Sequence, residues 1–184
     1  MRNQQLQAAT AGMIERFSPW LTHMLTLTLR DSKTDTYVNR HGWAKGAVQT
    51  RAFELTDAAA LSTLRYFIRV LNYKLHGRRT RKKRYKDVCR ILALPVMEGA
   101  KTHKRRHFHI LLGNVPAAKL ANLEMLVRDA WASTKWGMPR IEVKEIYDVD
   151  GASFYVSKEV GFYNEDAVLW EEASIPGRLM GKRA

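Results

Sequence analysis

The sequence contains a single cysteine, Cys89, among its 184 residues. An internal disulfide is therefore excluded, and so is a zinc site built from several cysteines. No apolar run approaches the roughly 20 residues that a membrane-spanning helix needs. The N-terminal residues also lack the apolar core of a signal peptide. These absences predict a cytoplasmic protein, in a reducing compartment, that has no membrane partner.

Acidic residues are scarce relative to basic ones. Eighteen Asp and Glu face 31 Lys and Arg, so the net charge is +13. Such an excess favours a polyanionic partner, because basic side chains neutralise phosphates and release their counterions. The charge gathers in two clusters, RRTRKKRYK at 78–86 and KTHKRR at 101–106. Each cluster is either a solvated loop or part of a nucleic-acid surface.

Both clusters flank the same pair of predicted strands, which favours a shared electropositive face. We expect these clusters to contact the backbone of a nucleic acid or to clamp a hairpin, and backbone contacts position a nucleic acid but do not read its sequence. The candidate residues are Arg78, Arg79, Lys82, Lys83, Arg84, Lys104, Arg105 and Arg106. Trp43, surrounded by basic and glycine residues in RHGWAKG, is a candidate for stacking on a base, although tryptophans are more often packed in a core.

Hydrophobic patterns predict both strands and helices. Residues 20–30 alternate, with leucines on one face and threonines on the other, as in a half-buried strand. Apolar residues recur every three or four positions between Thr56 and His76, which predicts a helix capped by Thr56 and ended by Gly77. The expected elements are helix 4–17, strand 20–30, a turn at 31–37, strand 37–49, helix 56–76, strands 87–98 and 106–115, helix 116–134, strand 140–148 and helix 151–163.

This element order predicts an α+β fold, with a central antiparallel β-sheet and flanking helices. A hairpin placed between two helices suits a ferredoxin-like or split βαβ topology. The last twenty residues carry little pattern.

Two histidines separated by one residue begin the strand KRRHFHILLG. Side chains alternate across a strand, so His107 and His109 point to one face and Phe108 to the other. Glu98 ends the preceding strand, and a hairpin would bring it beside both imidazoles. One carboxylate and two imidazoles leave open positions on a divalent ion, as a catalytic site requires. The ligand set accepts Mg²⁺, Mn²⁺ or Zn²⁺.

A tyrosine and a lysine share a face of the last predicted helix. Tyr155 and Lys158 are three residues apart in YVSK. A tyrosine hydroxyl can attack phosphorus and form a covalent intermediate. A neighbouring lysine offers positive charge to phosphate oxygens. Exposed helical tyrosines are common, so this motif gains its force from the histidine pair.

In order, the strand HMLTLTLR, then Glu98 with HFHILL, then FYVSK resemble motifs I, II and III of the HUH endonucleases. The likeness is closest to single-tyrosine initiators of rolling-circle replication and covers residues 20–163. It implies that Glu98, His107 and His109 hold a divalent metal, with Mg²⁺ or Mn²⁺ favoured and Zn²⁺ not excluded. It also implies that Tyr155 attacks the scissile phosphate and that Lys158 positions or neutralises it.

The resemblance further implies an HUH endonuclease domain at 19–164, preceded by a helical extension at 1–18 and followed by a tail at 165–184. The expected function is nicking and strand transfer of single-stranded origin or hairpin DNA, through a 5′-phosphotyrosine bond, to start replication of a plasmid or small single-stranded DNA element. No Walker A motif is present, so a host helicase is an expected partner, together with a host polymerase.

Two other functions fit part of the pattern. A transposase or relaxase of mobile DNA often uses the same residues, although a transposase of this kind more often has a different residue in place of Lys158. A noncatalytic single-stranded nucleic-acid-binding module would explain the charge and the aromatic residues. It would not explain the convergence of Glu98, His107 and His109.

Overall fold

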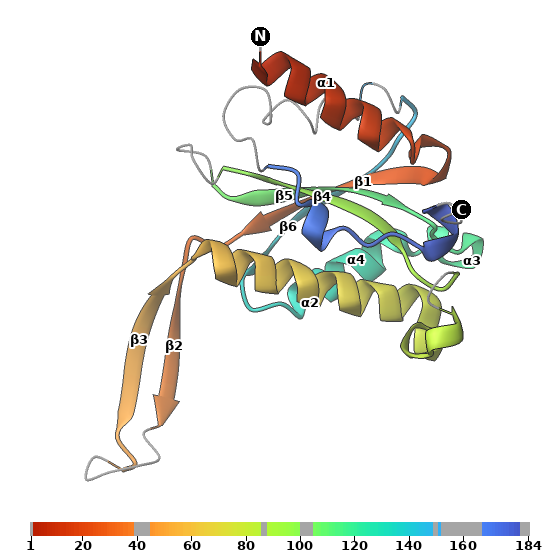
Figure 1. Cartoon of the computed structure of the whole chain (residues 1–184). Helices are drawn as coiled ribbons and strands as arrows, with labels where there is room; N and C mark the ends of the chain where they lie inside the picture. Colours follow the sequence, from red (N-terminus) through yellow and green to blue (C-terminus); the bar gives the residue numbers. More distant parts are fainter. Residues whose placement is uncertain are drawn as a thin grey trace.

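A computed structural model describes residues 2–38, 45–85, 88–99, 105–148, 151 and 167–180. Figure 1 shows a sheet with helices packed on its faces. The helices and strands, in chain order, are α1 (Arg2–Glu15), β1 (Leu21–Leu29), β2 (Ser32–Val38), β3 (Val48–Glu54), α2 (Asp57–His76), β4 (Leu92–Glu98), β5 (His107–Gly113), α3 (Ala117–Leu120), α4 (Leu123–Ala132) and β6 (Gly137–Glu145). The fold is therefore α+β, as the sequence predicts.

The central sheet has four antiparallel strands in the order β4-β5-β1-β6. Without the β2–β3 hairpin, the element order is β1-α2-β4-β5-α4-β6, which matches the β-α-β-β-α-β order of a ferredoxin-like arrangement. The histidine-bearing strand β5 is one of the two middle strands, so both of its edges are hydrogen-bonded.

One face of the sheet packs against α2 and α4. The alternate residues Leu25, Leu27 and Leu29 of β1 are fully buried in this layer. Phe108 of β5 joins them, and its ring lies edge-to-face with Trp131 of α4, with the ring centroids 6.4 Å apart. The alternation predicted for residues 20–30 is confirmed for Leu25, Leu27 and Leu29, whereas Leu21, before a bulge in the β1–β5 register, packs in the core of the opposite face. Phe108 does point away from the site that its two neighbouring histidines share.

The opposite face packs against α1 and the C-terminal segment. Ile14 of α1 is buried together with Leu94 of β4 and Leu111 of β5. Residues 167–174 run along the outer edge of β4, with bridges from Val96 to Val168 and from Ala93 to Ser174. The edge of β4 is therefore covered rather than exposed to pairing with another chain.

Helix α2 begins and ends where its sequence predicts. The side chain of Thr56 accepts a hydrogen bond from the amide of Ala59, as an N-cap residue does. Gly77 follows the last turn with a φ of 66°, which favours glycine because it carries no Cβ. At 20 residues, α2 is about 30 Å long.

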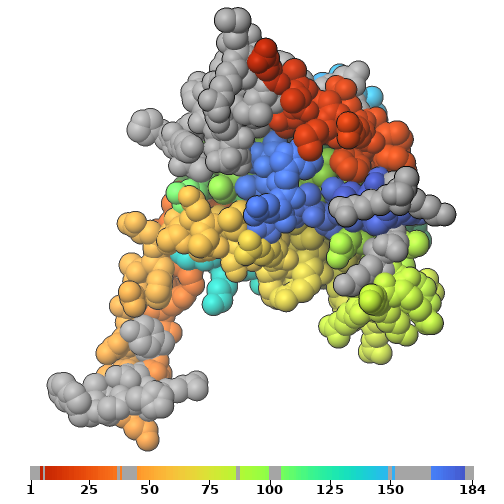
Figure 2. Space-filling model, viewed as in Figure 1, coloured from red at the N-terminus to blue at the C-terminus, as the bar shows by residue number. Residues whose placement is uncertain are grey.

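The region between β1 and α2 differs from the prediction. Residues 31–37, expected to form a turn, contain most of β2, and the strand expected at 37–49 is instead β3, seven residues from Val48. The two strands form a separate sheet that projects from the body (Figures 1 and 2). The sequence shows no alternation of apolar and polar residues here, because neither face of the hairpin is buried in the core. Every residue of β3 except Phe53 is exposed.

Other boundaries also shift. The helix expected at 116–134 is divided into α3 and α4, and the strand expected at 87–98 begins only at Leu92. The strand expected at 140–148 begins at Gly137. Of the helix expected at 151–163, only Gly151 belongs to the described residues. Among the described helices, none is long and apolar enough to cross a membrane.

Candidate metal centre

The pairing of β4 with β5 brings Glu98 directly opposite His107. Glu98 is the last residue of β4 and His107 is the first of β5, and they are partners in the antiparallel register. His109, two residues on, lies on the same face and is paired with Val96. The hairpin inferred from the sequence is thus confirmed, and with it the proximity of the three side chains.

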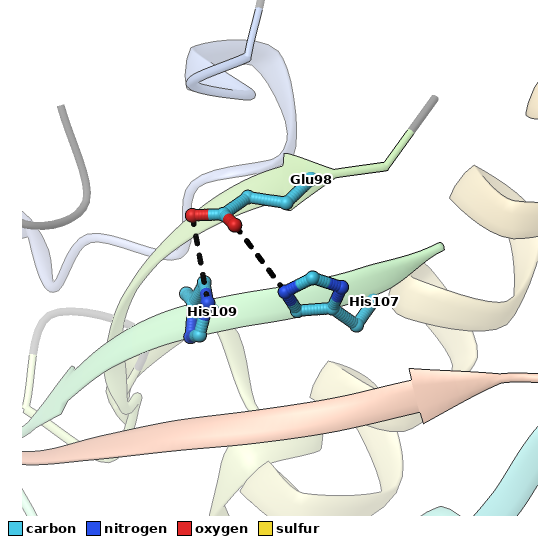
Figure 3. A group of neighbouring side chains, drawn as sticks. All are labelled: Glu98, His107 and His109. Carbon is cyan, nitrogen blue, oxygen red and sulfur yellow. Dashed lines mark ion pairs between the residues drawn. The ribbon is translucent and has the colours of Figure 1, made fainter. Parts of the chain in front are cut away.

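The carboxylate of Glu98 faces both imidazole rings, with one oxygen directed at each (Figure 3). Its Oε2 is 3.3 Å from Nε2 of His107, and its Oε1 is 3.5 Å from Nε2 of His109. The three potential ligand atoms all lie within 4.8 Å of one another. We call Glu98, His107 and His109 the triad.

The second nitrogen of each ring is held by a neighbouring group. Nδ1 of His107 is 2.9 Å from the carbonyl oxygen of Arg105, which can only accept a hydrogen bond. His107 therefore carries its proton on Nδ1 in the neutral form, which leaves the lone pair of Nε2 directed at Glu98. Nδ1 of His109 is 3.2 Å from the hydroxyl of Thr26. Such contacts orient metal-binding histidines.

The donor set and its burial fit a divalent cation. Glu98 and His109 are each only 3% exposed. A buried carboxylate is costly unless a positive charge or hydrogen bonds compensate it. A divalent ion bound at about 2.1 Å holds neighbouring ligand atoms roughly 3.0–3.4 Å apart, close to the distances seen here. The triad can therefore form a metal site. The alternative is an ion pair between Glu98 and a protonated imidazole, with no metal bound.

The sheet surface beside the triad is formed by β1 and β6. In the β1–β5 register, Thr26 is the partner of His109 and Thr28 is the partner of His107. Both threonines line a small hollow of about 190 Å³, which Arg140 and Glu142 of β6 also line. The role of Thr26 could not be predicted from the sequence. Thr26 and His109 are 83 positions apart, and neither strand's own residues specify how β1 aligns with β5.

Two of the predicted DNA-binding residues lie close to the triad and have acidic partners. Nε of Arg105 is 3.0 Å from a carboxylate oxygen of Asp31. The guanidinium of Arg106 is 3.4 Å from Asp57 and donates a hydrogen bond to the carbonyl of Leu55. Arg105 thus contacts the turn between β1 and β2, and Arg106 contacts the start of α2, so part of their charge is already balanced within the protein.

The other basic cluster lies at the far end of the same strands. Arg78, Arg79, Lys82, Lys83 and Arg84 belong to two short 3₁₀ turns, Gly77–Arg81 and Lys83–Tyr85, at the C-terminal end of α2. The triad lies at the other end, where Arg106 contacts Asp57 at the start of α2. The described residues of the two clusters therefore lie at opposite ends of β4, and the expectation of one shared electropositive face stays a prediction, because Lys101 and Lys104 lie outside the described residues.

Four predicted site residues lie outside the described residues: Tyr155, Lys158, Trp43 and Lys104. Their expected roles remain predictions from the sequence. Gly151 precedes the YVSK motif, and its amide donates a hydrogen bond to the side chain of Asp148, which follows β6.

Comparisons of the chain with models of protein families, with curated proteins and with solved structures found no match.

Proposed function

We propose that this protein is a metal-dependent, single-tyrosine DNA endonuclease and strand transferase that starts rolling-circle replication. The observation that carries the proposal is the convergence of Glu98, His107 and His109 on adjacent strands. A second support is the sequence motif YVSK, and a third is the net charge of +13, which suits a DNA substrate.

The triad would hold one divalent ion, with Mg²⁺ or Mn²⁺ favoured over Zn²⁺, which the same three ligands also accept. When bound, such an ion polarises the scissile phosphate and stabilises the negative charge that develops on it. The oxygen of Glu98 suits these harder ions, and the two imidazoles widen the choice to others. The contacts of Nδ1 of both rings keep the imidazoles oriented in advance, so little reorganisation is needed during the reaction.

Tyr155 would act as the nucleophile. Its phenolic oxygen forms a bond to phosphorus after losing its proton, and the bond from phosphorus to the 3′ oxygen breaks. The 3′ oxygen takes up a proton, which leaves a free 3′-hydroxyl and a 5′-phosphotyrosine. Lys158 would place its positive charge against the phosphate oxygens. Attack of a 3′-hydroxyl on the phosphotyrosine reverses the step and joins the strands.

A free 3′-hydroxyl is a primer, so a host polymerase would extend it. Because the sequence has no Walker A motif, a host helicase would separate the strands. The substrate would be single-stranded DNA at an origin or in a hairpin loop, in the cytoplasm of the cell that carries the replicon.

The test is to incubate the protein with single-stranded oligonucleotides covering the DNA that surrounds its gene, with Mn²⁺ or with EDTA. Denaturing gel electrophoresis then separates covalent protein–DNA adducts from free DNA. We expect an adduct with Mn²⁺, none with EDTA, and none for Tyr155→Phe, which removes only the attacking oxygen. Tyr147→Phe serves as the matched control, because Tyr147 is 90% exposed and contacts Glu145 rather than the triad.

A noncatalytic single-stranded nucleic-acid-binding module predicts a different result. Binding would fall steeply with salt, would not depend on metal, and would give no adduct with any oligonucleotide. That outcome would refute the nuclease and leave the triad as a buried ion pair. A transposase or relaxase would give the adduct too, but on the ends of a mobile element or at a transfer origin.

A further inference from the structure

A wide groove runs along the outer side of α2. It has a volume of about 820 Å³ and lies between α2 and the C-terminal segment, with the first basic turn at one end. Figure 2 shows the three parts side by side on one face: α2 in yellow, residues 167–180 in blue and the basic turns in yellow-green. The triad contributes no residue to this groove.

Arginines stacked on tyrosines line the groove. The guanidinium of Arg69 lies 5.1 Å from the ring centroid of Tyr66, and that of Arg81 lies 5.3 Å from the ring centroid of Tyr73. Both tyrosines are about two-fifths exposed, at 39% and 41%. Stacking fixes the plane of a guanidinium while its N–H groups remain available, so less conformational entropy is lost when the N–H groups bind an anion.

The charges in the groove favour an anion. Arg65, Arg69, Arg81 and Arg90 line it, against Glu171 and Glu172. Glu172 is held by Arg65 in a two-pronged contact, with Nε of Arg65 2.7 Å from Oε2. That pair is neutral overall, so Arg69, Arg81 and Arg90 face only the carboxylate of Glu171. The groove is therefore cationic.

The cationic surface continues beyond the groove. The 3₁₀ turns of residues 77–85 carry further exposed basic side chains on both sides of Arg81 in the sequence. Two of them, Arg79 and Arg84, lie over the ring of Tyr85, at 5.9 and 4.8 Å from its centroid. The repeated pairing of arginine with tyrosine makes one continuous surface from Arg69 to Arg84, which we call the α2 groove surface.

We infer that the α2 groove surface binds the phosphate backbone of duplex DNA. Phosphate suits the guanidinium fork, which donates two parallel hydrogen bonds to its oxygens. The guanidinium groups lie over the faces of the tyrosine rings, where a base from a single strand would have to stack. The surface therefore suits a backbone whose bases are already stacked in a duplex.

This inference goes beyond the proposed nuclease, because binding requires neither the triad nor Tyr155. The length of α2, about 30 Å, separates the basic turns from the triad end of the sheet. That length equals about nine base pairs at 3.4 Å each. The protein would thus bind duplex DNA about nine base pairs away from the phosphate that the metal centre contacts.

The experiment measures fluorescence anisotropy of a labelled 20-base-pair duplex of arbitrary sequence, in EDTA, at a series of KCl concentrations. The test variant is Arg69→Gln/Arg81→Gln. We expect the slope of log affinity against log salt to become shallower by about two, because each lost phosphate contact accounts for about 0.9. At 0.1 M salt the affinity should fall roughly 10- to 100-fold.

The charge-matched control is Arg16→Gln/Arg128→Gln, which removes two exposed arginines, one just after α1 and one in α4. Its slope should change by less than half as much. An unchanged slope in the test variant, or an equal loss in the control, would overturn the inference. Thermal unfolding checks that the test variant is folded, which we expect because both of its side chains are exposed.

Two further measurements separate an oriented phosphate site from simple charge. Arg69→Lys/Arg81→Lys keeps the charge but loses the planar fork, so we expect an intermediate loss of affinity. Wild-type affinity in this variant would contradict the role of the stacked guanidinium. Polyglutamate should compete for the surface more weakly than unlabelled duplex at equal charge, and equal competition would contradict phosphate recognition. Because every arm is run in EDTA, failure here leaves the nuclease test untouched.

Discussion

The two ends of the β4–β5 hairpin differ in whether their charged side chains contact one another or face the solvent. At one end, Glu98, His107 and His109 are directed at one another, and the nearby Arg105 and Arg106 contact acidic side chains. At the other end, exposed arginines lie over tyrosine rings at the surface. The first end places its charged groups against one another within the protein, in an arrangement that can hold a metal ion, and the second presents its charge outward.

The difference follows from burial. A buried carboxylate needs compensation within a few ångströms, which restricts the residues around it and fixes their geometry. Exposed arginines are solvated, so they remain available to a partner and contribute little to stability. We therefore expect changes at the triad end to alter metal affinity and chemistry, and changes at the other end to alter DNA affinity.

The largest effect should come from removing a triad imidazole. His107→Ala is the preferred change, because the side chain of His107 is 19% exposed and its loss leaves little cavity. We expect the affinity for Mn²⁺ to fall by at least about 100-fold, since even outer contacts of metal sites are worth 10- to 100-fold. Isothermal titration calorimetry measures this.

His23→Gln is the matched control for that change. His23 is also a histidine of the central sheet, but it lies on β1 with its Nδ1 beside the hydroxyl of Thr22. Its metal affinity should equal that of the wild type. An equal loss in both variants would mean that the calorimeter reports unfolding or scattered surface sites instead of the triad.

A smaller effect should come from the residue that orients His109. Thr26→Val removes the hydroxyl next to Nδ1 of His109 and keeps the shape of the side chain. We expect about a tenfold loss of Mn²⁺ affinity. Thr28→Val, two residues along the same face, should lose less, because Nδ1 of His107 is held by the carbonyl of Arg105. Equal losses in the two variants would contradict the orienting role of Thr26.

The sequence could predict the triad but not the contact of Thr26 that orients His109. Positions i and i+2 of a strand share a face, and a hairpin joins the end of one strand to the start of the next, so the proximity of Glu98 to both histidines followed from local rules. The contact of Thr26 with His109 depends on the register of β1 against β5, two strands joined through α2 and β4. Nothing local specifies that register.

The β2–β3 hairpin was missed for a related reason. Strand prediction relies on one apolar face, and this hairpin projects from the body with most of its side chains exposed. Only the basic turns of the α2 groove surface were predicted from the sequence, and the groove itself was missed. Arg69 and Arg81 lie on different elements, and the segment that closes the groove, residues 171–174, carries no pattern of its own.

A third change should raise DNA affinity. Glu172→Gln removes the carboxylate that holds Arg65 and leaves that guanidinium free to contact phosphate. We expect duplex affinity to increase several-fold and the salt slope to steepen by about one. Because Glu172 is largely buried while Arg65 is exposed, thermal unfolding checks that the variant stays folded. A decrease in DNA affinity would contradict the placement of duplex DNA in this groove.

The smallest effect concerns pH. Burial lowers the pKa of His76, at the end of α2, and the positive charge of Arg178 adds to this effect. Because the folded state binds the proton less readily, the contribution of neutral His76 to stability is complete above a pH of about 6.5, the ordinary pKa of histidine, and is lost as the pH falls below it. Thermal unfolding between pH 7.5 and 5.5 should show a weaker pH dependence in His76→Gln than in the wild type. An identical dependence would exclude His76 as its source.

The most direct test of the metal centre is a crystal structure of the protein grown with Mn²⁺, with data collected at the manganese absorption edge. The account predicts an anomalous peak about 2.0–2.3 Å from Nε2 of His107, from Nε2 of His109 and from a carboxylate oxygen of Glu98. If the map instead shows no peak there, and Glu98 keeps its direct contacts with both imidazoles, the triad is an ion pair and the proposed chemistry is wrong.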